Sequence, residues 1–420
     1  MATVTIDGSN VTAVCTTKDE RGGGEAIEWH RRGGRPSFLT LRGPAGLLNG
    51  TIGVSQGVLS GLGAGFTGVL WRKDYEADAD DVWATLVFAD TSIYFPKRIV
   101  KDGEDSEGRS CRGLITQDPG NFSDPSIIED FLYGPSIMGA AIQNSNDLDG
   151  SFGPVGLSVG SVTLDLGTDL TGYRPSGWPL TLDQLRAELS NAGVLAYKML
   201  GTSIRLYEGP TVAGSFVNQP LEYGTGAFNC QGYRYSQEME NVFNVVWSLL
   251  GAKAPKCPDD VQHWRGNVTI DDSPLGPNAG IEDRPNDPLE GEYVGIPDPP
   301  FSAIAALSLA SRSTYGRLQR VDEYDLYKDE RTPSEKRAFR RLAQMLWLQT
   351  SLYCANPRQM VTMIPEPGVT PSFDVYDTIP VAAGGAVSFS GEQRVYEFKV
   401  GIDTEGNATL KEIVTSPNLG

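Results

Sequence analysis

Glycine and proline interrupt this chain so often that its fold must contain many turns. The 420 residues include 49 glycines and 27 prolines, and both residue types are unfavourable inside helices. Residues 50–68 alone hold seven glycines, which is too many for a helix interior, so loops or weak strands are predicted there. The chain is therefore predicted to be β-rich rather than a helical bundle.

Length and charge further restrict which kind of protein this chain can be. At roughly 100 to 200 residues per domain, a chain of this length is expected to form two to four domains. Apolar residues make up 40% and charged residues 21%, which is a globular balance. The formal net charge of -18 disfavours sequence-independent nucleic-acid binding through a basic face, because acidic groups repel phosphate.

The chain carries no sign of secretion or membrane insertion. Its first residues lack a basic segment followed by an apolar one, and no run approaches the roughly 20 apolar residues that span a bilayer. Synthesis as a soluble cytoplasmic product without a membrane anchor is therefore predicted. Reduced thiols are predicted because the cysteines are scattered and form no Cys-x-x-Cys pair; they are Cys15, Cys111, Cys230, Cys257 and Cys354.

Strands are predicted where β-branched and aromatic runs lie between turn residues. Asp7-Gly8 favours a tight hairpin turn between strands at 4–6 and 11–14. Two further strands are predicted at 82–88 and 93–100, with a helix over 80–90 as the alternative. A second hairpin is predicted at the end of the chain, with strands at 395–400 and 408–414 around a turn at 403–406.

Four helices are predicted from apolar stripes and end signals. The clearest in the middle of the chain begins after Thr181, which forms a capping box with Gln184, and two strand-like runs at 194–199 and 204–207 follow it. The other helices are predicted at 125–132, 303–315 and 333–355. Residues 271–301 contain seven prolines and few apolar side chains, which predicts a linker or an extended arm.

Two Gly-x-Ser-x-Gly segments match the pattern around a hydrolase nucleophile, with Ser55 and Ser158 at the serine position. That chemistry needs a strand before the serine, a helix after it and a histidine base nearby. The residues after Ser55 are rich in glycine, those after Ser158 are strand-like, and His263 is the one downstream histidine. Both matches are therefore interpreted as chance.

Cofactor and metal motifs are equally incomplete. The Gly-x-Gly-x-x-Gly pattern at 63–68 precedes a strand-like run, whereas a dinucleotide site needs a helix there, so a turn is predicted. Residues 145–150 resemble part of a calcium loop but lack the opening Asp and the closing Glu, so a turn is predicted again. His30 and His263 are isolated, and no cofactor, no metal site and no catalytic residue is predicted.

Carboxylate pairs and tryptophans leave one enzymatic alternative open. Two acids across a groove can cleave a glycosidic bond, and aromatic rings can line a sugar-binding groove. An even spread of aromatic residues is more typical of a core. The chain has seven tryptophans, at positions 29, 71, 83, 178, 247, 264 and 347.

Several segments, taken in order, resemble one family. These are the strand pair that follows residues 80–83, the helix at 124–132, the capped helix with its hairpin at 181–207, and residues 240–247 leading to Gly251. Two later segments complete the set, Ala310-Ser-Arg-Ser-Thr-Tyr-Gly316 and Arg394-Val-Tyr-Glu-Phe-Lys-Val400. Over most of residues 70–420, this order resembles the minor tail proteins that form the tail-tip hub, or baseplate hub, of long-tailed phages (siphoviruses) infecting actinobacteria.

The resemblance implies an α+β, β-rich, multi-domain architecture with tail-tube-like β-barrel domains and α+β insertions. The boundaries that we expect on this basis are an N-terminal β-rich domain at 1–165, an α+β middle domain at 166–270, the Pro-rich arm at 271–301, and a helical pair followed by a β domain at 302–420.

The resemblance also implies a structural role at the virion tail tip, with no enzyme activity. Three copies would form a pseudo-sixfold ring that links the tail tube to tip proteins and forms the channel for genome ejection. Implied partners are other copies of the chain, a distal tail protein, the tape measure protein, and tip proteins or fibres, with DNA only in transit. The alternative is a phage-associated cell-wall glycan hydrolase or a host-surface glycan-binding tail module.

The acidity acquires a more specific meaning in such a channel. A lumen lined with carboxylates repels passing phosphates and prevents them from sticking. Asp78, Asp80 and Asp81 are candidates for this lining. The hypothesis concerns where the acids lie, not the total charge.

Overall fold

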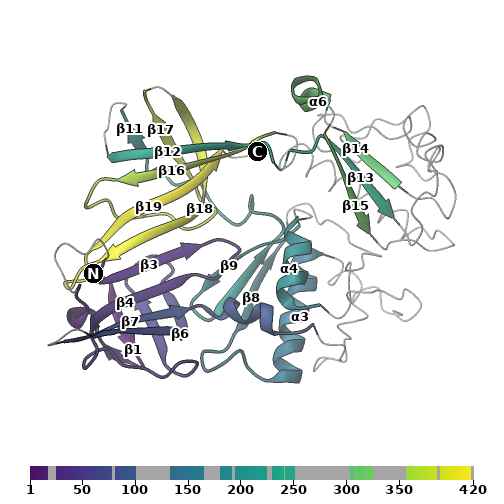
Figure 1. The fold of residues 1–420 in the computed structure, drawn as a ribbon. Coiled ribbons are helices and arrows are strands. Elements are labelled where there is room, and N and C mark those ends of the chain that lie inside the picture. Colours follow the sequence, from purple (N-terminus) through teal and green to yellow (C-terminus); the bar gives the residue numbers. More distant parts are fainter. Residues whose placement is uncertain are drawn as a thin grey trace.

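The computed structural model of the chain is built mainly of β-strands, gathered in one large sheet and two small ones (Figure 1). Helices lie beside the small sheets. The structure describes residues 1–17, 25–77, 81–100, 133–164, 180–191, 194–224, 229–240, 242–250, 303–307, 309–316, 318–324, 356–385 and 388–417.

The large sheet takes strands from both ends of the chain. It contains 13 strands, most of them antiparallel, in the order β12-β16-β19-β18-β3-β4-β7-β6-β5-β1-β2, with β17 and β11 branching from β18. The N-terminal strands are β1 (Thr3–Ile6), β2 (Ser9–Asn10), β3 (Ile27–Arg32), β4 (Phe38–Pro44), β5 (Gln56–Ser60), β6 (Phe66–Ala77) and β7 (Val82–Ala89). The later strands are β11 (Leu221–Tyr223), β12 (Cys230–Glu238), β16 (Arg358–Pro365), β17 (Thr378–Ala383), β18 (Phe389–Ile402) and β19 (Ala408–Pro417).

Strand β18 joins the two ends of the chain. Its residues 397–402 pair with residues 27–32 of β3 on one side, and β19 lies on its other side. Side chains alternate between the two faces of a strand, so Trp29 of β3 and Phe398 of β18 point into one core, where their rings meet edge to face at 5.6 Å. The N-terminal and C-terminal halves of the sheet therefore share a hydrophobic core.

The described strands do not close into a barrel, unlike the tail-tube-like barrels that the resemblance implies. The strand order ends at β2 and β12, and no described pairing connects those two ends. Two contacts nevertheless bring parts of the sheet together beyond the strand order. The amide of Ala2, before β1, donates to the carbonyl of Gly406 in the β18–β19 turn of the C-terminal half at 2.8 Å. Within the C-terminal half, Tyr223 of β11 meets Tyr233 of β12 at 5.4 Å.

Two α+β units accompany the large sheet. In the first, β8 (Ser158–Thr163), β10 (Ser203–Tyr207) and β9 (Ala196–Leu200) form a sheet beside α3 (Gly134–Asp149) and α4 (Leu182–Asn191). In the second, β14 (Ala303–Leu307), β13 (Val245–Leu250) and β15 (Gln319–Tyr324) accompany α6 (Leu309–Tyr315). Short 3-10 helices lie at Thr12–Val14 (η1) and Thr91–Lys97 (η2). In the parts of the chain that the structure describes, no helix combines the length and apolar character needed to cross a bilayer.

Three local predictions are confirmed. Asp7 and Gly8 have φ angles of 48° and 83° between paired β1 and β2, as the predicted turn requires. The strand predicted at 11–14 is wrong, because the pairing with β1 ends at Asn10 and residues 12–14 form the 3-10 helix η1. Thr181 and Gln184 form the capping box of α4: the Gln184 side chain accepts from the Thr181 amide at 2.7 Å and the Thr181 hydroxyl accepts from the Gln184 amide at 3.2 Å. The C-terminal hairpin is present, with longer strands than predicted.

Three further local predictions are wrong. The strand predicted at 93–100 is largely the 3-10 helix η2, because Asp90 caps it and Pro96 cannot donate to a strand ladder. The helix predicted at 303–315 begins as β14, which pairs with β13, and becomes helical only at Leu309. The turn predicted at 145–150 is the last turn of α3, which ends at Gly150 with φ 77°. The features predicted at 125–132, 271–301 and 333–355 lie outside the described residues.

Candidate functional site: a charged seam between the two halves

A buried ion pair lies where the two halves of the large sheet meet, a region that we call the seam. Arg31 occupies the inward-facing position of β3 after Ile27 and Trp29, and its side chain is 2% exposed. Its Nε and Nη2 donate to the two carboxylate oxygens of Asp374 at 2.9 and 3.0 Å, and Lys198 of β9 lies 3.7 Å from the same carboxylate. One acid therefore connects the N-terminal half, the first α+β unit and the C-terminal half.

The segment that carries Asp374 is held in an unusual conformation. Asp377 accepts from the amides of Asp374 at 2.7 Å and of Ser215 at 2.9 Å. Tyr376, which is buried and lies between Asp374 and Asp377 in the sequence, has φ 70°. This left-handed conformation is costly for a bulky residue. Gly214 passes so close to this segment that a Cβ there would lie 2.1 Å from the Tyr376 carbonyl oxygen. The surrounding packing fixes the position of the carboxylate.

Asp90 is a second buried acid near the seam. Its carboxylate accepts from the Ser37 amide at 2.7 Å and from both the amide and the hydroxyl of Ser92, at 3.0 and 2.6 Å. Burial raises the pKa of Asp90 above its usual value, although these hydrogen bonds and the charge of Arg31 favour the ionised form. The bonds cap η2 and tie it to the loop before β4, which is a structural role.

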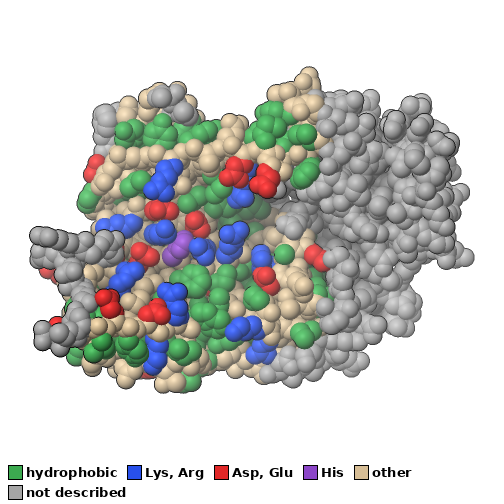
Figure 2. Space-filling view, in the orientation of Figure 1, with side chains coloured by type: hydrophobic (Ala, Val, Ile, Leu, Met, Phe, Trp, Pro, Cys, Tyr) green, Lys and Arg blue, Asp and Glu red, His purple; other side chains and the backbone are tan. Residues whose placement is uncertain are grey.

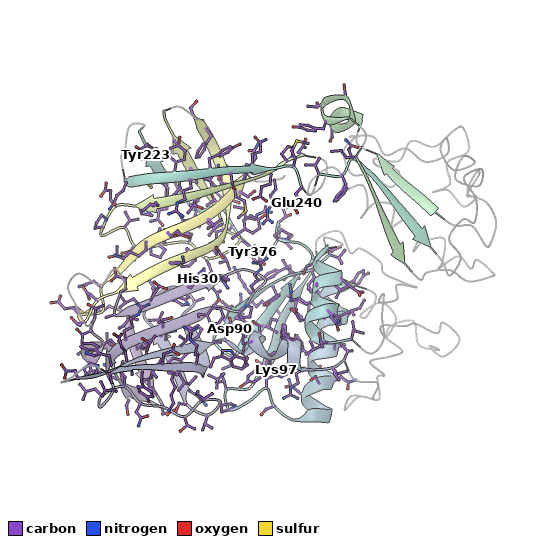
Figure 3. All side chains as sticks on the ribbon, viewed as in Figure 1. His30, Asp90, Lys97, Tyr223, Glu240 and Tyr376 are labelled. Atoms are coloured by element: carbon purple, nitrogen blue, oxygen red, sulfur yellow. The ribbon has the colours of Figure 1, made fainter. Side chains whose placement is uncertain are left out.

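Basic side chains surround the seam at the surface. Arg32 and His30 of β3 lie 3.4 and 3.5 Å from the carboxylate of Glu397 on β18, and the hydrogen bond from His30 is the largest cause of the lowered pKa of Glu397. Arg205 of β10 is exposed and pairs opposite Lys198, which lies beside Asp374. Figure 2 shows Lys and Arg side chains in a band across the face between the two halves, and Figure 3 places His30, Asp90 and Tyr376 along this region.

The seam holds charges in fixed positions but does not form an acid–base catalytic pair. Burial raises the pKa of Asp374, but the charge and hydrogen bonds of Arg31 and the charge of Lys198 outweigh it, so the pKa lies below its usual range. An acid held ionised by two cations is a poor proton carrier at neutral pH. Among the described residues, no group of three His, Cys, Asp or Glu side chains is arranged to hold a metal ion.

The serine motifs lack the geometry of a nucleophile. The hydroxyl of buried Ser55 accepts from the Thr51 amide at 2.9 Å just before β5, and Ser158 opens β8. Neither serine lies between a strand and a helix. His30 is bound at the seam, and His263 lies outside the described residues. In the segment 63–68, Gly63 lies in a turn and Gly68 already lies in β6, so the segment leads into a strand rather than a helix.

The described tryptophans do not gather in one groove. Trp29 is in the core, Trp71 packs against Tyr94 at 5.7 Å, and Trp83 lies on β7. Trp247 lies on β13, and the positions 178, 264 and 347 fall outside the described residues.

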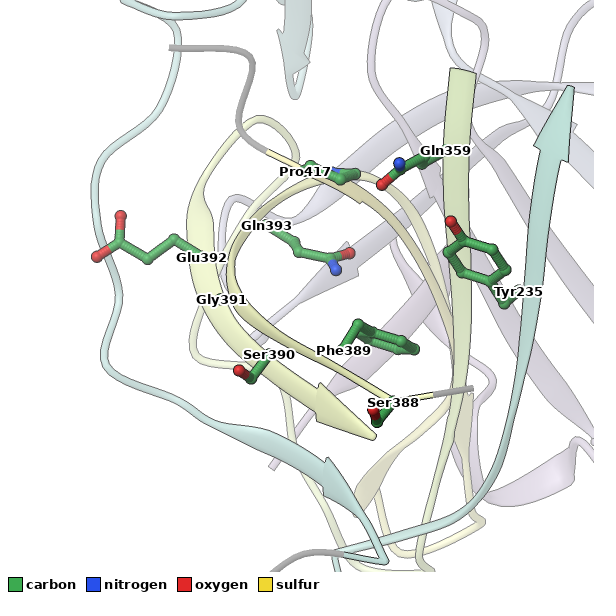
Figure 4. A pocket seen from close by; sticks show the side chains of 9 residues that line it. All are labelled: Tyr235, Gln359, Ser388, Phe389, Ser390, Gly391, Glu392, Gln393 and Pro417. Carbon is green, nitrogen blue, oxygen red and sulfur yellow. The ribbon is translucent and has the colours of Figure 1, made fainter. Parts of the chain in front are cut away.

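A pocket of about 280 Å³ opens at the far end of the C-terminal half, between β12, β16 and β18 (Figure 4). Tyr235 and Phe389 stack at 6.0 Å, and buried Gln393 accepts from the Thr415 hydroxyl at 2.6 Å. Glu392 is the one carboxylate in the lining, and Figure 4 shows it pointing away from the cavity. This arrangement offers an aromatic wall but no pair of acids for glycosidic cleavage.

Sequence reasoning missed the seam because its partners are 343 positions apart. One signal was present: the alternation in β3 places Arg31 on the same face as Ile27 and Trp29. A cation in the apolar series of a strand requires a buried acid as partner. Nothing in the sequence identifies that acid as Asp374.

Comparison with known proteins shows which class of fold this is. The whole chain superimposes on the 43 kDa tail protein of prophage MuSo2 from Shewanella oneidensis with a TM-score of 0.53, covering 98% of this chain and 97% of that one at 9% sequence identity. A tail protein from Neisseria meningitidis MC58 gives a TM-score of 0.52, with 99% and 96% coverage at 8% identity. No family model and no curated protein matches the sequence.

These similarities extend from one end of the chain to the other, so they concern the arrangement of all the units. The chain has the fold of phage tail proteins, a β-rich α+β fold with a large antiparallel sheet. At such low identity, the similarity is one of fold.

Proposed function

We propose that this chain is a structural virion protein that forms the tail-tip hub of a long-tailed phage infecting actinobacteria. The observation that carries the proposal is the similarity to phage tail proteins over nearly the full length of both chains. The fixed geometry of the buried ion pair at the seam is consistent with a structural role.

The ring would be pseudo-sixfold and made from three copies. The N-terminal and C-terminal halves of the large sheet, joined by β3 and β18, would each supply one unit, so three chains would present six units around an axis. Such a ring matches the symmetry of a tube above it and leaves a central channel for the genome. The proposed neighbours are a distal tail protein, the tape measure protein, and the tip proteins or fibres.

Virion analysis tests the proposal directly. Mass spectrometry of purified virions is expected to find the chain at a few copies per particle, and gold-labelled antibodies are expected to mark the tail tip. A phage with a stop codon early in the gene is expected to yield no infectious particles, and expression of the chain in trans is expected to restore them. Absence from virions would contradict the proposal.

Activity assays separate the proposal from its alternatives. The purified chain is expected to release no sugar or peptide from actinobacterial cell walls and to bind no isolated cell-wall glycan. Turnover that disappears when a carboxylate pair is changed to amides would instead establish a hydrolase. Glycan binding without turnover would establish a receptor-binding module.

A further inference from the structure

The pocket at the end of the C-terminal half has the walls of a peptide-binding site. Its volume of about 280 Å³ is at the lower end for ligand sites, which suits a few residues of a chain better than a cofactor. Tyr235 of β12 and Phe389 of β18 stack at 6.0 Å and form one wall. Both side chains are half-buried, so part of each ring stays open to a ligand.

A buried amide points into this pocket from β18. Gln393 is 5% exposed, and its Oε1 accepts from the Thr415 hydroxyl at 2.6 Å. Its Nε2 forms no hydrogen bond to any described residue, and Figure 4 shows the side chain pointing from β18 toward Tyr235 on the opposite side. Because the oxygen already holds the Thr415 hydroxyl, Gln393 offers a donor to the pocket. A buried donor requires an acceptor, which the ligand must bring.

The described lining presents no charge to the inside of the pocket. Glu392 is its one charged residue, and the carboxylate points away from the cavity. The other polar side chains of the lining are those of Gln359, Ser388 and Ser390, together with the Tyr235 hydroxyl. An ionised group placed here would lose its hydration without gaining a partner of opposite charge. The ligand that fits is neutral, carries hydrogen-bond acceptors and has apolar parts that pack on aromatic rings.

A proline-rich backbone has these properties. Proline fixes φ and lacks an N–H, so Pro-x-x-Pro segments favour the polyproline II conformation, in which the carbonyl oxygens are free to accept. Grooves lined by aromatic rings recognise such segments. A sugar also packs on aromatic rings, but its hydroxyls donate as well as accept, and the oxygen of Gln393 is already engaged.

The chain itself contains such segments. All four Pro-x-x-Pro spacings of the sequence fall between the end of β13 and the start of β14, outside the described residues, at 255–258, 274–277, 285–288 and 297–300. Three of them enclose a charged residue, namely Lys256, Asp287 and Asp298. Pro274-Leu-Gly-Pro277, in the Pro-rich arm, encloses none, so it is the segment that fits an uncharged pocket.

The arm is long enough to reach the pocket of its own chain. Leu249 of β13 pairs opposite Ala303 of β14, so the segment between them leaves and returns at one place. About 25 residues separate Pro274 from that place in either direction along the chain, and they span up to roughly 80 Å. A compact protein of this length is about 55 Å across. The pocket lies at the end of the large sheet where β12 leads toward β13 (Figure 1).

We propose that the pocket binds residues 274–277 of the same chain. The two prolines pack on Tyr235 and Phe389, and a carbonyl of the segment accepts from Gln393 Nε2. A tether of this length gives the segment an effective concentration of about 1 mM, which favours the chain's own arm over that of another copy at micromolar protein. The inference does not depend on the proposed hub function, since it concerns how one chain arranges its own arm.

Peptide binding to the full-length chain tests the inference. The probe is a fluorescein-labelled peptide of residues 270–280, and fluorescence anisotropy measures its dissociation constant. The variant Pro274→Ala with Pro277→Ala frees the pocket of its own arm, so the peptide is expected to bind this variant about tenfold more tightly than the wild type.

The chain supplies a matched control peptide. Residues 281–291 have the same length and carry Pro285 and Pro288 at the same two places, but they place Asp287 between them. This peptide is expected to bind the proline variant at least tenfold more weakly than the peptide of residues 270–280. Equal binding of the two peptides would contradict recognition by an uncharged pocket.

A filled pocket is expected to exclude the peptide. Ser390 is exposed and belongs to the lining, so Ser390→Trp can occupy the cavity without entering the core. Added to the proline variant, it is expected to abolish peptide binding. Ser236→Trp is the control: Ser236 is exposed and points to the opposite face of β12 from Tyr235, so binding is expected to persist. Thermal melting of each variant distinguishes a filled pocket from an unfolded chain.

Photo-crosslinking identifies the occupant in the intact protein. With Leu275 replaced by p-benzoylphenylalanine, mass spectrometry is expected to find crosslinks to the pocket lining within one chain. Crosslinks between two chains would overturn the assignment to the same chain. Peptide binding that does not improve in the proline variant, or that survives Ser390→Trp, would overturn the inference. Binding of neutral oligosaccharides in place of the peptide would overturn it in favour of a sugar site.

Discussion

Asp374 illustrates how one side chain can hold several parts of a fold together. Its ion pair with Arg31 is buried, and removing one partner leaves the other charge without compensation. Asp374→Asn is therefore expected to lower the free energy of unfolding by about 3 kcal/mol at pH 7. Urea unfolding followed by tryptophan fluorescence measures this difference, with Glu392→Gln, an exposed acid on β18, expected to change little.

Because the pKa of Asp374 is lowered in the folded protein, the difference in unfolding free energy between wild type and Asp374→Asn depends on pH. A carboxyl whose pKa is lower in the folded state stabilises the fold fully above its unfolded pKa, about 4. This contribution is lost as the pH falls through the folded value. The gap in stability between wild type and Asp374→Asn is therefore expected to be largest near neutral pH and to shrink below pH 4. A gap of constant size down to pH 2.5 would show that Asp374 acts through packing alone.

Gly214 is required by a close approach of two backbones rather than by its own dihedral angles. A Cβ at this position would lie 2.1 Å from the Tyr376 carbonyl oxygen and 2.6 Å from the Asp377 nitrogen. Gly214→Ala is expected to destabilise the protein by about 3 kcal/mol, since the seam backbone must move. At Gly232 a Cβ meets nothing within 4 Å, so Gly232→Ala is expected to stay within about 0.5 kcal/mol. Thermal melting compares the two, and equal effects would contradict the account.

At the scale of single elements, the capping box of α4 can be tested by changing one side chain. The Thr181 hydroxyl accepts from the Gln184 amide at 3.2 Å, and loss of such a cap costs about 1 kcal/mol. Thr181→Ala is expected to lower stability by this amount and to speed hydrogen exchange of amides in the first turn of α4. Ser190→Ala, near the other end of the helix, is the control and is expected to be neutral or slightly stabilising.

Elements with local signals were predictable from the sequence, and elements decided by distant contacts were not. The capping box at Thr181 and the turn at Asp7-Gly8 each depend on a few adjacent residues. Residues 303–307 have helix-compatible composition, but pairing with β13 makes them a strand. The short helix η2 depends on buried Asp90, whose caps reach back to Ser37. Tertiary contacts override local propensity at such positions.

At the scale of the whole molecule, the β-rich class of fold was predictable from the sequence. The pairing of β3 with β18, which joins the two halves of the large sheet, was not. Residues 27–32 pair with residues 397–402, and no periodicity links segments so far apart. The resemblance to tail proteins depended on the order of loose motifs, and the structural similarity at 9% identity agrees with it. The predicted domain boundaries stay predictions, as does the acidic lumen: Asp81 is exposed, and Asp78 and Asp80 lie outside the described residues.

The net charge of -18 and the basic band at the seam make opposite predictions about DNA. If the net charge decides whether the chain binds DNA, the chain is expected to leave a 30-base-pair duplex unbound at 150 mM salt, because phosphates are repelled at long range. If the seam were a DNA-binding surface, binding would appear at low salt, weaken steeply as salt rises, and disappear in Arg32→Glu with Arg205→Glu.

Fluorescence anisotropy of a labelled duplex at 50 and 150 mM salt separates the two cases. We expect no binding at either salt concentration, since Arg31 is buried against Asp374 and Arg32 pairs with Glu397. This partial neutralisation weakens the attraction of the seam for phosphates. Salt-sensitive binding that requires Arg32 and Arg205 would instead place the seam beside the path of the genome.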